Sequence, residues 1–255
     1  SGLIGSACIR RLVAQGYERI LSPTRNELDL TQASSVARYF SNNKVDVVIL
    51  AAGTVGGIAD NINRPFDYIS ENLQICLNVC VNANLYALKK IVLMGSSCMY
   101  PLHTTQPMPV SALFSGDLEP TSLPYAFSKL ASINFGLSFN KQFNSSRYLA
   151  IIPNSTYGPG DNFDVKSGHV LSSLLHKFHV AKDRRMPVIK LWGTGTPRRE
   201  FIYSEDVADA IIFMLENGIE TQDEPINIGV GYDISIADLA DIISDVVGFK
   251  GNISW

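Results

Sequence analysis

The segment KIVLMGSSCMYP, residues 90–101, joins a run of apolar residues to a glycine and two serines. Short apolar runs alternate with stretches of helical periodicity on either side of it. Such alternation, with strands that are apolar throughout, is typical of a parallel sheet covered by helices on both faces. The sequence therefore predicts an α/β fold with a doubly wound parallel sheet. The expected strands lie near 19–21, 45–50, 90–94 and 148–152, and the expected helices near 32–41, 65–87 and 123–143.

The composition sets broad limits on size and partners. At 255 residues and 46% hydrophobic content, the chain is long enough for one or two closely joined domains. Its net charge of -3 gives no basic field to attract a polyanion, which argues against nucleic-acid binding. No apolar run approaches the ~20 residues of a membrane span, and the first residues lack the features of a signal peptide. We therefore expect no membrane association and a cytoplasmic location.

Two long connections, at about 98–122 and 153–167, are rich in Pro, Gly, Ser and Asn. Loops of that length inside a compact domain are usually functional. We expect a dinucleotide-binding domain at 1–157, rejoined by 200–225, and a smaller α/β substrate-binding lobe formed by 158–199 and 226–255. The elements expected after residue 167 are strands near 188–192, 201–202 and 225–228, with helices after 167, from 204 and near 236–247.

Gly2 and Gly5 stand directly before the first helical stretch. They fit the last two glycines of a G-x-x-G-x-x-G turn, which brings the backbone close to a pyrophosphate and a helix close to a sheet. An incidental turn is the alternative, because no strand precedes the pair, and we expect the first strand of the nucleotide-binding fold to be missing. Together with the predicted sheet, the turn favours a Rossmann-like fold.

The strand expected near 19–21 is not followed by an acid, whereas NAD-specific folds place Asp or Glu there to bind the ribose hydroxyls. Arg25 comes shortly after it, and a guanidinium suits a 2′-phosphate. NADP(H) is therefore the predicted cofactor, although Arg25 could also be a solvated surface charge. Ala51 and Ala52, after the strand expected near 45–50, are small enough for a cofactor to run close to the backbone.

Tyr125 and Lys129 lie four residues apart in an expected helix, so both side chains project from one face. A free tyrosine titrates near ~10 and needs a nearby cation to exchange protons at neutral pH. A Y-x-x-x-K pattern occurs by chance in many proteins. It gains meaning from Ser96 and Ser97, which follow an apolar strand where open α/β sheets bind ligands. One of these serines could hydrogen-bond a substrate carbonyl beside Tyr125.

The cysteines and histidines predict neither a disulfide framework nor a metal site. Four cysteines are too few and too irregular for a framework, and Cys76 and Cys80 fit small core residues at helical spacing. His176 and His179 also have helical spacing, but no carboxylate or cysteine stands at a suitable distance.

These and further motifs resemble, in order and over nearly the whole chain, the GDP-L-fucose synthase family of extended short-chain dehydrogenases. The resemblance implies 3,5-epimerisation of GDP-4-keto-6-deoxy-D-mannose and NADPH-dependent reduction of its C4 ketone. Besides Tyr125 and Lys129, the matching motifs are Val55-Gly56-Gly57-Ile58, Gly95-Ser96-Ser97-Cys98-Met99-Tyr100-Pro101, Leu118-Glu119-Pro120-Thr121, Tyr157-Gly158-Pro159, Asp161-Asn162-Phe163, His169-Val170, Trp192-Gly193-Thr194-Gly195 and Arg199-Glu200-Phe201.

The resemblance implies catalytic roles residue by residue. Ser96 and Tyr125 bind the C4 oxygen, Tyr125 protonates it, and Lys129 tunes Tyr125. Cys98 and His169 match the acid/base pair of the epimerisation. That role is chemically reasonable because the neighbouring ketone acidifies the C3 and C5 hydrogens. A buried thiol is the alternative interpretation of Cys98, and a helix cap is that of His169.

Residues that hold the GDP moiety are also implied. Trp192 and Arg199 match positions that contact GDP, and Lys177 stands in the basic stretch that faces its phosphates. Alternatively, Trp192 fills the core and Arg199 pairs with Glu200 or Asp206.

Further implied contacts concern the adenine and the hexose. Asp29 and Leu30 match the adenine site of the cofactor, and Ser97 joins Ser96 in the substrate site. The family usually has Asn where this chain has Ser155, with Asn154 one place earlier. Because that Asn generally touches substrate, the substitution leaves the identity of the hexose open.

Relatives pair helices matching 65–87 and 123–143 into a four-helix bundle, so a homodimer is expected. Relatives also continue beyond the position of Trp255 with a basic tail that contacts substrate, and we therefore expect this chain to be a fragment.

Two other functions stay open. The first is an NAD-dependent sugar-nucleotide 4-epimerase. The presence of Arg25 without an acidic residue to bind the ribose argues against it, and the pair Cys98 and His169 argues against it more strongly. The second is a non-catalytic dinucleotide-binding regulator, against which stands the intact set Ser96, Tyr125 and Lys129.

Overall fold

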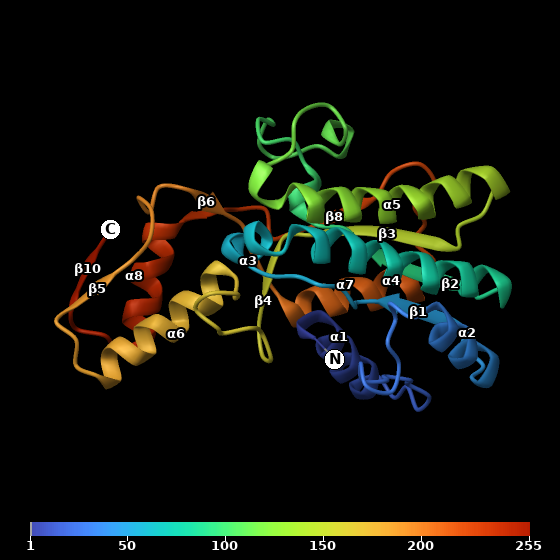
Figure 1. Ribbon diagram of the computed structural model, residues 1–255, viewed down its shortest axis with the longest axis horizontal. Coiled ribbons are helices and arrows are strands. Elements are labelled where there is room, and N and C mark those ends of the chain that lie inside the picture. The colour runs from blue at the N-terminus through green and yellow to red at the C-terminus, as the bar shows by residue number, and fades with distance from the viewer. Residues whose placement is uncertain (1) are drawn as a thin grey trace.

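The computed structural model describes residues 2–255 and is built around a parallel sheet (Figure 1). Within these residues the main sheet has four strands in the order β1-β2-β3-β8, all parallel. The α/β class and the parallel arrangement predicted from the sequence are confirmed. The strands are β1 (Val47–Leu50), β2 (Lys90–Met94), β3 (Tyr148–Pro153) and β8 (Ile226–Ile228).

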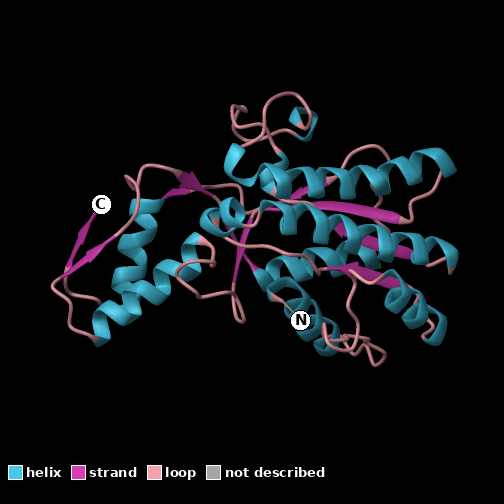
Figure 2. Cartoon of the chain, viewed as in Figure 1, coloured by secondary structure: helices cyan, strands magenta, loops and turns pink. Residues whose placement is uncertain are grey.

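Helices cover both faces of this sheet, as Figure 2 shows. Side chains of successive residues in β3 enter different cores, because a strand alternates its faces. Tyr148, Ala150 and Ile152 pack in the core under α2, α4 and α5, whereas Leu149 and Ile151 pack in the core under α1 and α7. The sheet is therefore doubly wound. The covering helices are α1 (Leu3–Ala14), α2 (Ala33–Asn42), α4 (Pro65–Leu85), α5 (Leu123–Phe143) and α7 (Ser204–Glu216).

The prediction of a strand near 19–21 is wrong. Within residues 2–255 that segment has no strand pairing, and β1 forms the edge of the main sheet. A strand exists only where its backbone N–H and C=O groups find a partner strand, and apolar character alone does not supply one.

A smaller lobe extends from the sheet at the left of Figure 1. It packs α6 (Val170–Asp183) against α8 (Ile236–Val247), with Phe178 and Leu239 in its core. A Ser235–Asp238 capping box starts α8, and Gly248 ends it with a φ of 77°. The lobe also contains the parallel pair β5 (Val188–Lys190) and β10 (Asn252–Ser254).

Short strands connect the lobe to the main body. β4 (Ser155–Tyr157) pairs with β7 (Phe201–Tyr203), and β6 (Arg198–Arg199) pairs with β9 (Ile234–Ser235). The lobe boundary expected at residue 226 differs from the structure, because β8 hydrogen-bonds to β3 and belongs to the main sheet. A short strand pattern such as Ile226-Asn227-Ile228 before a loop suits an edge strand of the main sheet as well as a lobe strand.

The long connection after β2 is held by three short 3₁₀ turns, Ser97–Met99, Val110–Ala112 and Pro120–Ser122. Tyr100 anchors it to the sheet, since its hydroxyl donates to Asn227 Oδ1 of β8 at 2.6 Å. A further helix, α3 (Ile58–Asn63), lies between β1 and α4. Among residues 2–255, no helix is both long and apolar enough to cross a membrane.

Candidate active site

The turn after β2 positions Ser96 and Cys98. Ser96 is the N-cap of the 3₁₀ turn Ser97–Met99, and its Oγ accepts from the backbone N–H of Cys98 at 3.4 Å. This arrangement keeps both side chains at the carboxyl end of β2, where parallel sheets bind ligands. Cys98 is half-buried, so the alternative of a fully buried thiol is wrong.

Helix α5 brings Tyr125 and Lys129 to the same place. Lys129 Nζ lies 5.7 Å from the centroid of the Tyr125 ring. Burial raises the pKa of Tyr125, the nearby Cys98 raises it further, and the hydroxyl of Ser96 opposes the rise. Burial also lowers the pKa of Lys129 to about 8, against the opposing effect of Cys76. The structure thus gathers Ser96, Cys98, Tyr125 and Lys129, with Tyr125 protonated and able to donate at neutral pH.

Two residues of α4 that the sequence motifs did not reveal support this group. Tyr68 is fully buried and meets the Tyr125 ring edge to face. The buried Asn72 holds the loop after β1, because its Oδ1 accepts from Thr54 N at 3.0 Å and its Nδ2 donates to Thr54 O at 2.9 Å. The available signal was a polar amide on the otherwise apolar face of α4, which is costly to bury without partners.

His169 is linked to this group through glycines. The backbone N–H of Gly57 donates to Ser167 O at 2.9 Å, and a Cβ at Gly56 would collide with the hydroxyl of Tyr68. His169 then begins α6 as its N-cap, but its side chain makes no capping hydrogen bond. His169 therefore does cap the helix, as the alternative interpretation expected, but only through its backbone, and its exposed imidazole makes no capping bond. Between residues 2 and 255, no hydrogen bond joins His169 to Cys98.

Small residues stand at the start of α1 and after β1, where the sequence predicts the pyrophosphate of a dinucleotide. Gly2 is the N-cap of α1, whose first turn carries no acid, and a Cβ there would meet nothing within 4 Å. A Cβ at Gly5 would lie 3.5 Å from that of Ala51, next to the exposed Ala52. An open helix N-terminus beside small residues suits a pyrophosphate. The structure brings Gly5 and Ala51 together, and the set fits a dinucleotide.

The adenosine end of the expected cofactor site is more open. The side chain of Arg25 is 70% exposed, and its guanidinium lies 3.8 Å from Glu71 Oε2. Asp29 accepts from the N–H and hydroxyl of Thr31 at 3.0 and 2.7 Å, which lowers the pKa of its carboxyl. Leu30 is fixed by its carbonyl, which accepts from Asn78 Nδ2 of α4 at 2.9 Å. Because of its exposure and its long distance to Glu71, Arg25 is only loosely held.

Candidate contacts for the GDP moiety lie on the lobe. Trp192 is 79% exposed, so the alternative that it fills the core is wrong. The guanidinium of Arg199 donates to Arg198 O at 2.7 Å, and in the described part of the chain it forms no ion pair with Glu200 or Asp206. Glu200 instead accepts from the backbone of the 230–231 loop. Lys177 is half-buried on α6.

The hexose position flagged by the sequence lies where the sheet meets the lobe. Ser155 begins β4 opposite Phe201. The side chain of Asn154 turns toward Gly229, where an added Cβ would lie 2.6 Å from its Nδ2. Asn154 therefore faces the backbone turn at Gly229.

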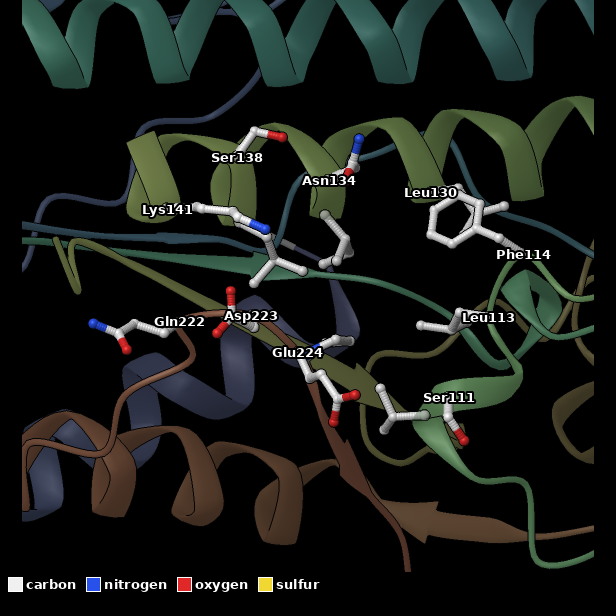
Figure 3. Close-up of a pocket in the computed structure, with 14 residues that line it drawn as sticks. Ser111, Leu113, Phe114, Leu130, Asn134, Ser138, Lys141, Gln222, Asp223 and Glu224 are labelled. Carbon is white, nitrogen blue, oxygen red and sulfur yellow. The ribbon is translucent and has the colours of Figure 1, made fainter. Parts of the chain in front are cut away.

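A cavity of about 550 Å³ lies elsewhere, between α5 and the loops around Leu113 and Asp223 (Figure 3). Its walls contain none of the predicted site residues. A narrower crevice at the carboxyl ends of β1 and β2 is lined by Asn72, Cys76 and Lys129. Across residues 2–255, no cluster of His, Cys, Asp and Glu has a metal-binding arrangement.

Comparison with known proteins confirms the resemblance. Residues 1–229 match the NAD dependent epimerase/dehydratase family. GDP-L-fucose synthase 1 of Arabidopsis thaliana is 42% identical over 256 residues, covering 100% of this chain and 78% of that protein. A GDP-D-glycero-L-gluco-heptose synthase of Campylobacter jejuni, crystallised in the presence of NADPH, superposes with a TM-score of 0.92 at 34% identity, covering 99% and 84%. A GDP-6-OMe-4-keto-L-xylo-heptose reductase of the same species gives a TM-score of 0.93 at 33% identity, covering 99% and 83%.

Proposed function

Because the chain belongs to the NAD dependent epimerase/dehydratase family and, within it, to the GDP-L-fucose synthases, we propose that its substrate is GDP-4-keto-6-deoxy-D-mannose. It is an epimerase/reductase of GDP-sugars that uses a nicotinamide dinucleotide. The observation that carries the proposal is the grouping of Ser96, Cys98, Tyr125 and Lys129 at the end of β2. The reaction inverts C3 and C5 and then reduces the C4 ketone.

The reduction needs a proton donor at the ketone oxygen. A bound dihydronicotinamide supplies the hydride to C4. Ser96 and Tyr125 hold the C4 oxygen by hydrogen bonds, and Tyr125 gives it a proton as negative charge develops there. The high pKa of Tyr125 keeps this proton in place until the oxygen becomes basic. The ammonium form of Lys129 stabilises the phenolate that remains.

The epimerisation needs two proton-transfer groups on opposite faces of the sugar. The C4 ketone acidifies the neighbouring C–H bonds, so a base can remove the proton from C3 or C5 and leave an enolate. Cys98 and His169 are the two candidates, one to remove the proton and the other to return it to the opposite face. The half-buried thiol beside Tyr125 and the imidazole released from helix capping support these roles.

NADPH is the proposed form of the cofactor. Arg25 is exposed and only loosely paired with Glu71, so its guanidinium can turn to a 2′-phosphate without losing a strong partner. Asp29 and Leu30 would then border the adenine. The open N-terminus of α1, between Gly2 and Gly5, would receive the pyrophosphate.

Side chains of the lobe are proposed to bind the GDP moiety. The exposed indole of Trp192 offers a flat surface for stacking a base, and among residues 2–255 Arg199 has no acidic partner to neutralise it. Lys177 would add a second positive charge for the diphosphate. Ser97 and Ser155 would contact the hexose. Because Asn154 is turned toward Gly229, Ser155 takes the place where relatives present an amide.

We also propose a homodimer through the outer faces of α4 and α5. Leu77, Val81 and Leu85 form a stripe along α4 at helical spacing and are 47%, 56% and 74% exposed. Phe127 of α5 is 55% exposed, and the two helices pack side by side. Pairing with the same faces of a second chain would build a four-helix bundle and remove this apolar surface from water.

The deciding experiment follows NADPH oxidation with GDP-4-keto-6-deoxy-D-mannose and identifies the product by NMR. We expect net oxidation of one NADPH per sugar and a product inverted at C3 and C5. A 4-epimerase would return its hydride and show no net oxidation, and a regulator would bind cofactor without turnover. A reduced product that retains the D-manno configuration would leave only the reductase half of the proposal.

A further inference from the structure

Glu71, on α4, brings a carboxylate to the adenosine end of the expected cofactor site. Its Oε2 lies 3.8 Å from the guanidinium of Arg25. The same oxygen accepts a hydrogen bond from the hydroxyl of Thr54, in the loop after β1. The sequence has no acid directly after residues 19–21, so the fold supplies one from a distant element instead. None of the proposed roles applies to this carboxylate.

The carboxylate of Glu71 is held in its position. Its side chain is only 25% exposed, whereas that of Arg25 is 70% exposed. The loop that holds it is itself fixed, because the side chain of Asn72 bonds both the N–H and the carbonyl of Thr54. Water and salt screen a partly buried charge less than an exposed one. Arg25 is therefore the mobile member of the pair, and Glu71 is the fixed one.

The acids on the segment of Arg25 itself are engaged in local turns. Glu27 accepts from the N–H and the hydroxyl of Thr24, each at 2.8 Å. The carboxylate of Asp29 is held within its own turn by the two hydrogen bonds described above. Over residues 2–255, Glu71 is the acid that forms an ion pair with Arg25. Its carboxylate is therefore the group that an anionic ligand of Arg25 would have to replace.

We infer that Glu71 is a specificity-determining residue for the cofactor: its fixed carboxylate competes with a 2′-phosphate for Arg25 and so lowers the preference for NADPH over NADH. The inference rests on the proposed NADPH site at Arg25 and names the group that limits it. A phosphate monoester carries roughly two negative charges at neutral pH, and like charges at short range repel each other. NADH has a hydroxyl in place of this phosphate, so the carboxylate does not repel it in this way. Neutralising Glu71 should therefore favour NADPH selectively.

Two variants remove this charge in different ways. Glu71→Gln keeps the shape of the side chain, and its amide oxygen can still accept from the hydroxyl of Thr54. Glu71→Ala removes the hydrogen bond to Thr54 together with the charge. The matched control is Asp67→Asn, which removes an acid one turn earlier on the same helix. That acid pairs with Arg64 at 2.9 Å.

The first measurement is titration calorimetry with NADPH and with NADH, which needs neither a sugar substrate nor turnover. In about 0.05 M salt, Glu71→Gln and Glu71→Ala should each raise the ratio of the Kd for NADH to the Kd for NADPH by about 5-fold. The change should come from tighter binding of NADPH, and Asp67→Asn should leave the ratio unchanged. An unchanged or lower ratio in Glu71→Gln overturns the inference. A ratio that rises only because NADH binds more weakly also overturns it, since Glu71 would then bind the ribose hydroxyls.

The second measurement repeats these titrations in about 1 M salt. Salt screens an effect of charge, whereas it leaves an effect of packing in place. The difference in the Kd ratio between wild type and Glu71→Gln should therefore fall below about 2-fold. A difference that stays the same at high salt contradicts the competition, because the substitution would then act by altering the packing around Thr54.

Arg25→Ala separates this inference from the proposed function. If Arg25→Ala lowers the preference for NADPH while Glu71→Gln leaves it unchanged, the inference fails and the proposed NADPH site stands. If Glu71→Gln raises the preference while Arg25→Ala leaves it unchanged, another group binds the phosphate. The proposed role of Arg25 then fails, together with the competition for its guanidinium.

Discussion

The ring of Tyr68 meets the ring of Tyr125 edge to face, with centroids 6.0 Å apart and planes at 85°. The hydroxyl of Tyr68 donates to Asp60 Oδ2 at 2.7 Å, and Asp60 pairs with Arg64 at 3.5 Å. The proposed proton donor thus rests on a buried ring that is fixed at its other end. This contact also joins the loop of Gly56 to the active site.

Gly56→Ala should destabilise the protein, because its Cβ would collide with the hydroxyl of Tyr68. We expect a loss of ~1–3 kcal/mol in the free energy of unfolding, measured by urea denaturation. Tyr68→Phe alone should cost ~1 kcal/mol through the lost hydrogen bond to Asp60. In the double variant the two losses should be less than additive, since the colliding oxygen is absent. Strict additivity would show that the collision is relieved elsewhere.

Tyr125→Phe should abolish most of the reduction while leaving proton exchange at carbon. Losing a positioned acid typically costs ~10²- to 10⁴-fold in rate. The C3 and C5 hydrogens remain acidic as long as the ketone persists. The variant should therefore still incorporate solvent deuterium at these carbons, while NADPH oxidation nearly stops. Mass spectrometry measures the deuterium uptake. Equal loss of both activities would argue against separate roles.

Cys98→Ser and His169→Asn should show the converse pattern. Each removes one proton-transfer group of the proposed pair, so deuterium uptake at C3 and C5 should slow by ~10²-fold or more. Reduction should continue only on the sugar that has not been inverted, and NMR of the product identifies it. His176→Asn is a matched control, because this imidazole is held by Phe163 O at 2.7 Å. If both variants exchange at the wild-type rate, the epimerase assignment fails.

Arg25→Ala should reduce the preference for NADPH over NADH. A single charge-assisted contact to a 2′-phosphate is worth ~1–3 kcal/mol, which corresponds to a ~5- to 150-fold change in the ratio of the two Kd values. Titration calorimetry with both cofactors measures it. Arg38 is an exposed arginine on α2, and Arg38→Ala should leave the ratio unchanged. An unchanged ratio in Arg25→Ala would mean that this side chain is only a surface charge.

Val81→Glu should weaken the proposed dimer. Val81 lies in the middle of the exposed stripe on α4, and a carboxylate there would be desolvated on pairing. Light scattering at micromolar concentration should show a dimer for wild type and a monomer for the variant. Val246→Glu, on the outer face of α8 and 78% exposed, is the control and should stay dimeric. A monomeric wild type would contradict the four-helix arrangement.

Sequence periodicity predicted the long elements well, because a helix such as α8 carries its own hydrogen bonds and one apolar face. The segment near 19–21 was misjudged, since a strand depends on a partner strand that its own sequence does not specify. Tyr125, Lys129 and Ser96 could be predicted because their spacing has a chemical reason. Tyr68 and Asn72 could not, because their importance lies in what they contact across α4 and α5. The exposure of Trp192 likewise depends on the packing of the lobe.

The hydrogen bond from Gly57 N–H to Ser167 O uses only backbone atoms, so it does not depend on the side chain at position 167. Side chains of the lobe can be exchanged without disturbing the anchor that precedes His169. A change in the proposed hexose contacts could therefore leave the proposed acid–base pair in place. Diversification of sugar preference would then proceed mainly through substitutions at positions such as Ser155, and any Cβ at Gly57 would be purged, because it would strike the carbonyl of Gly168.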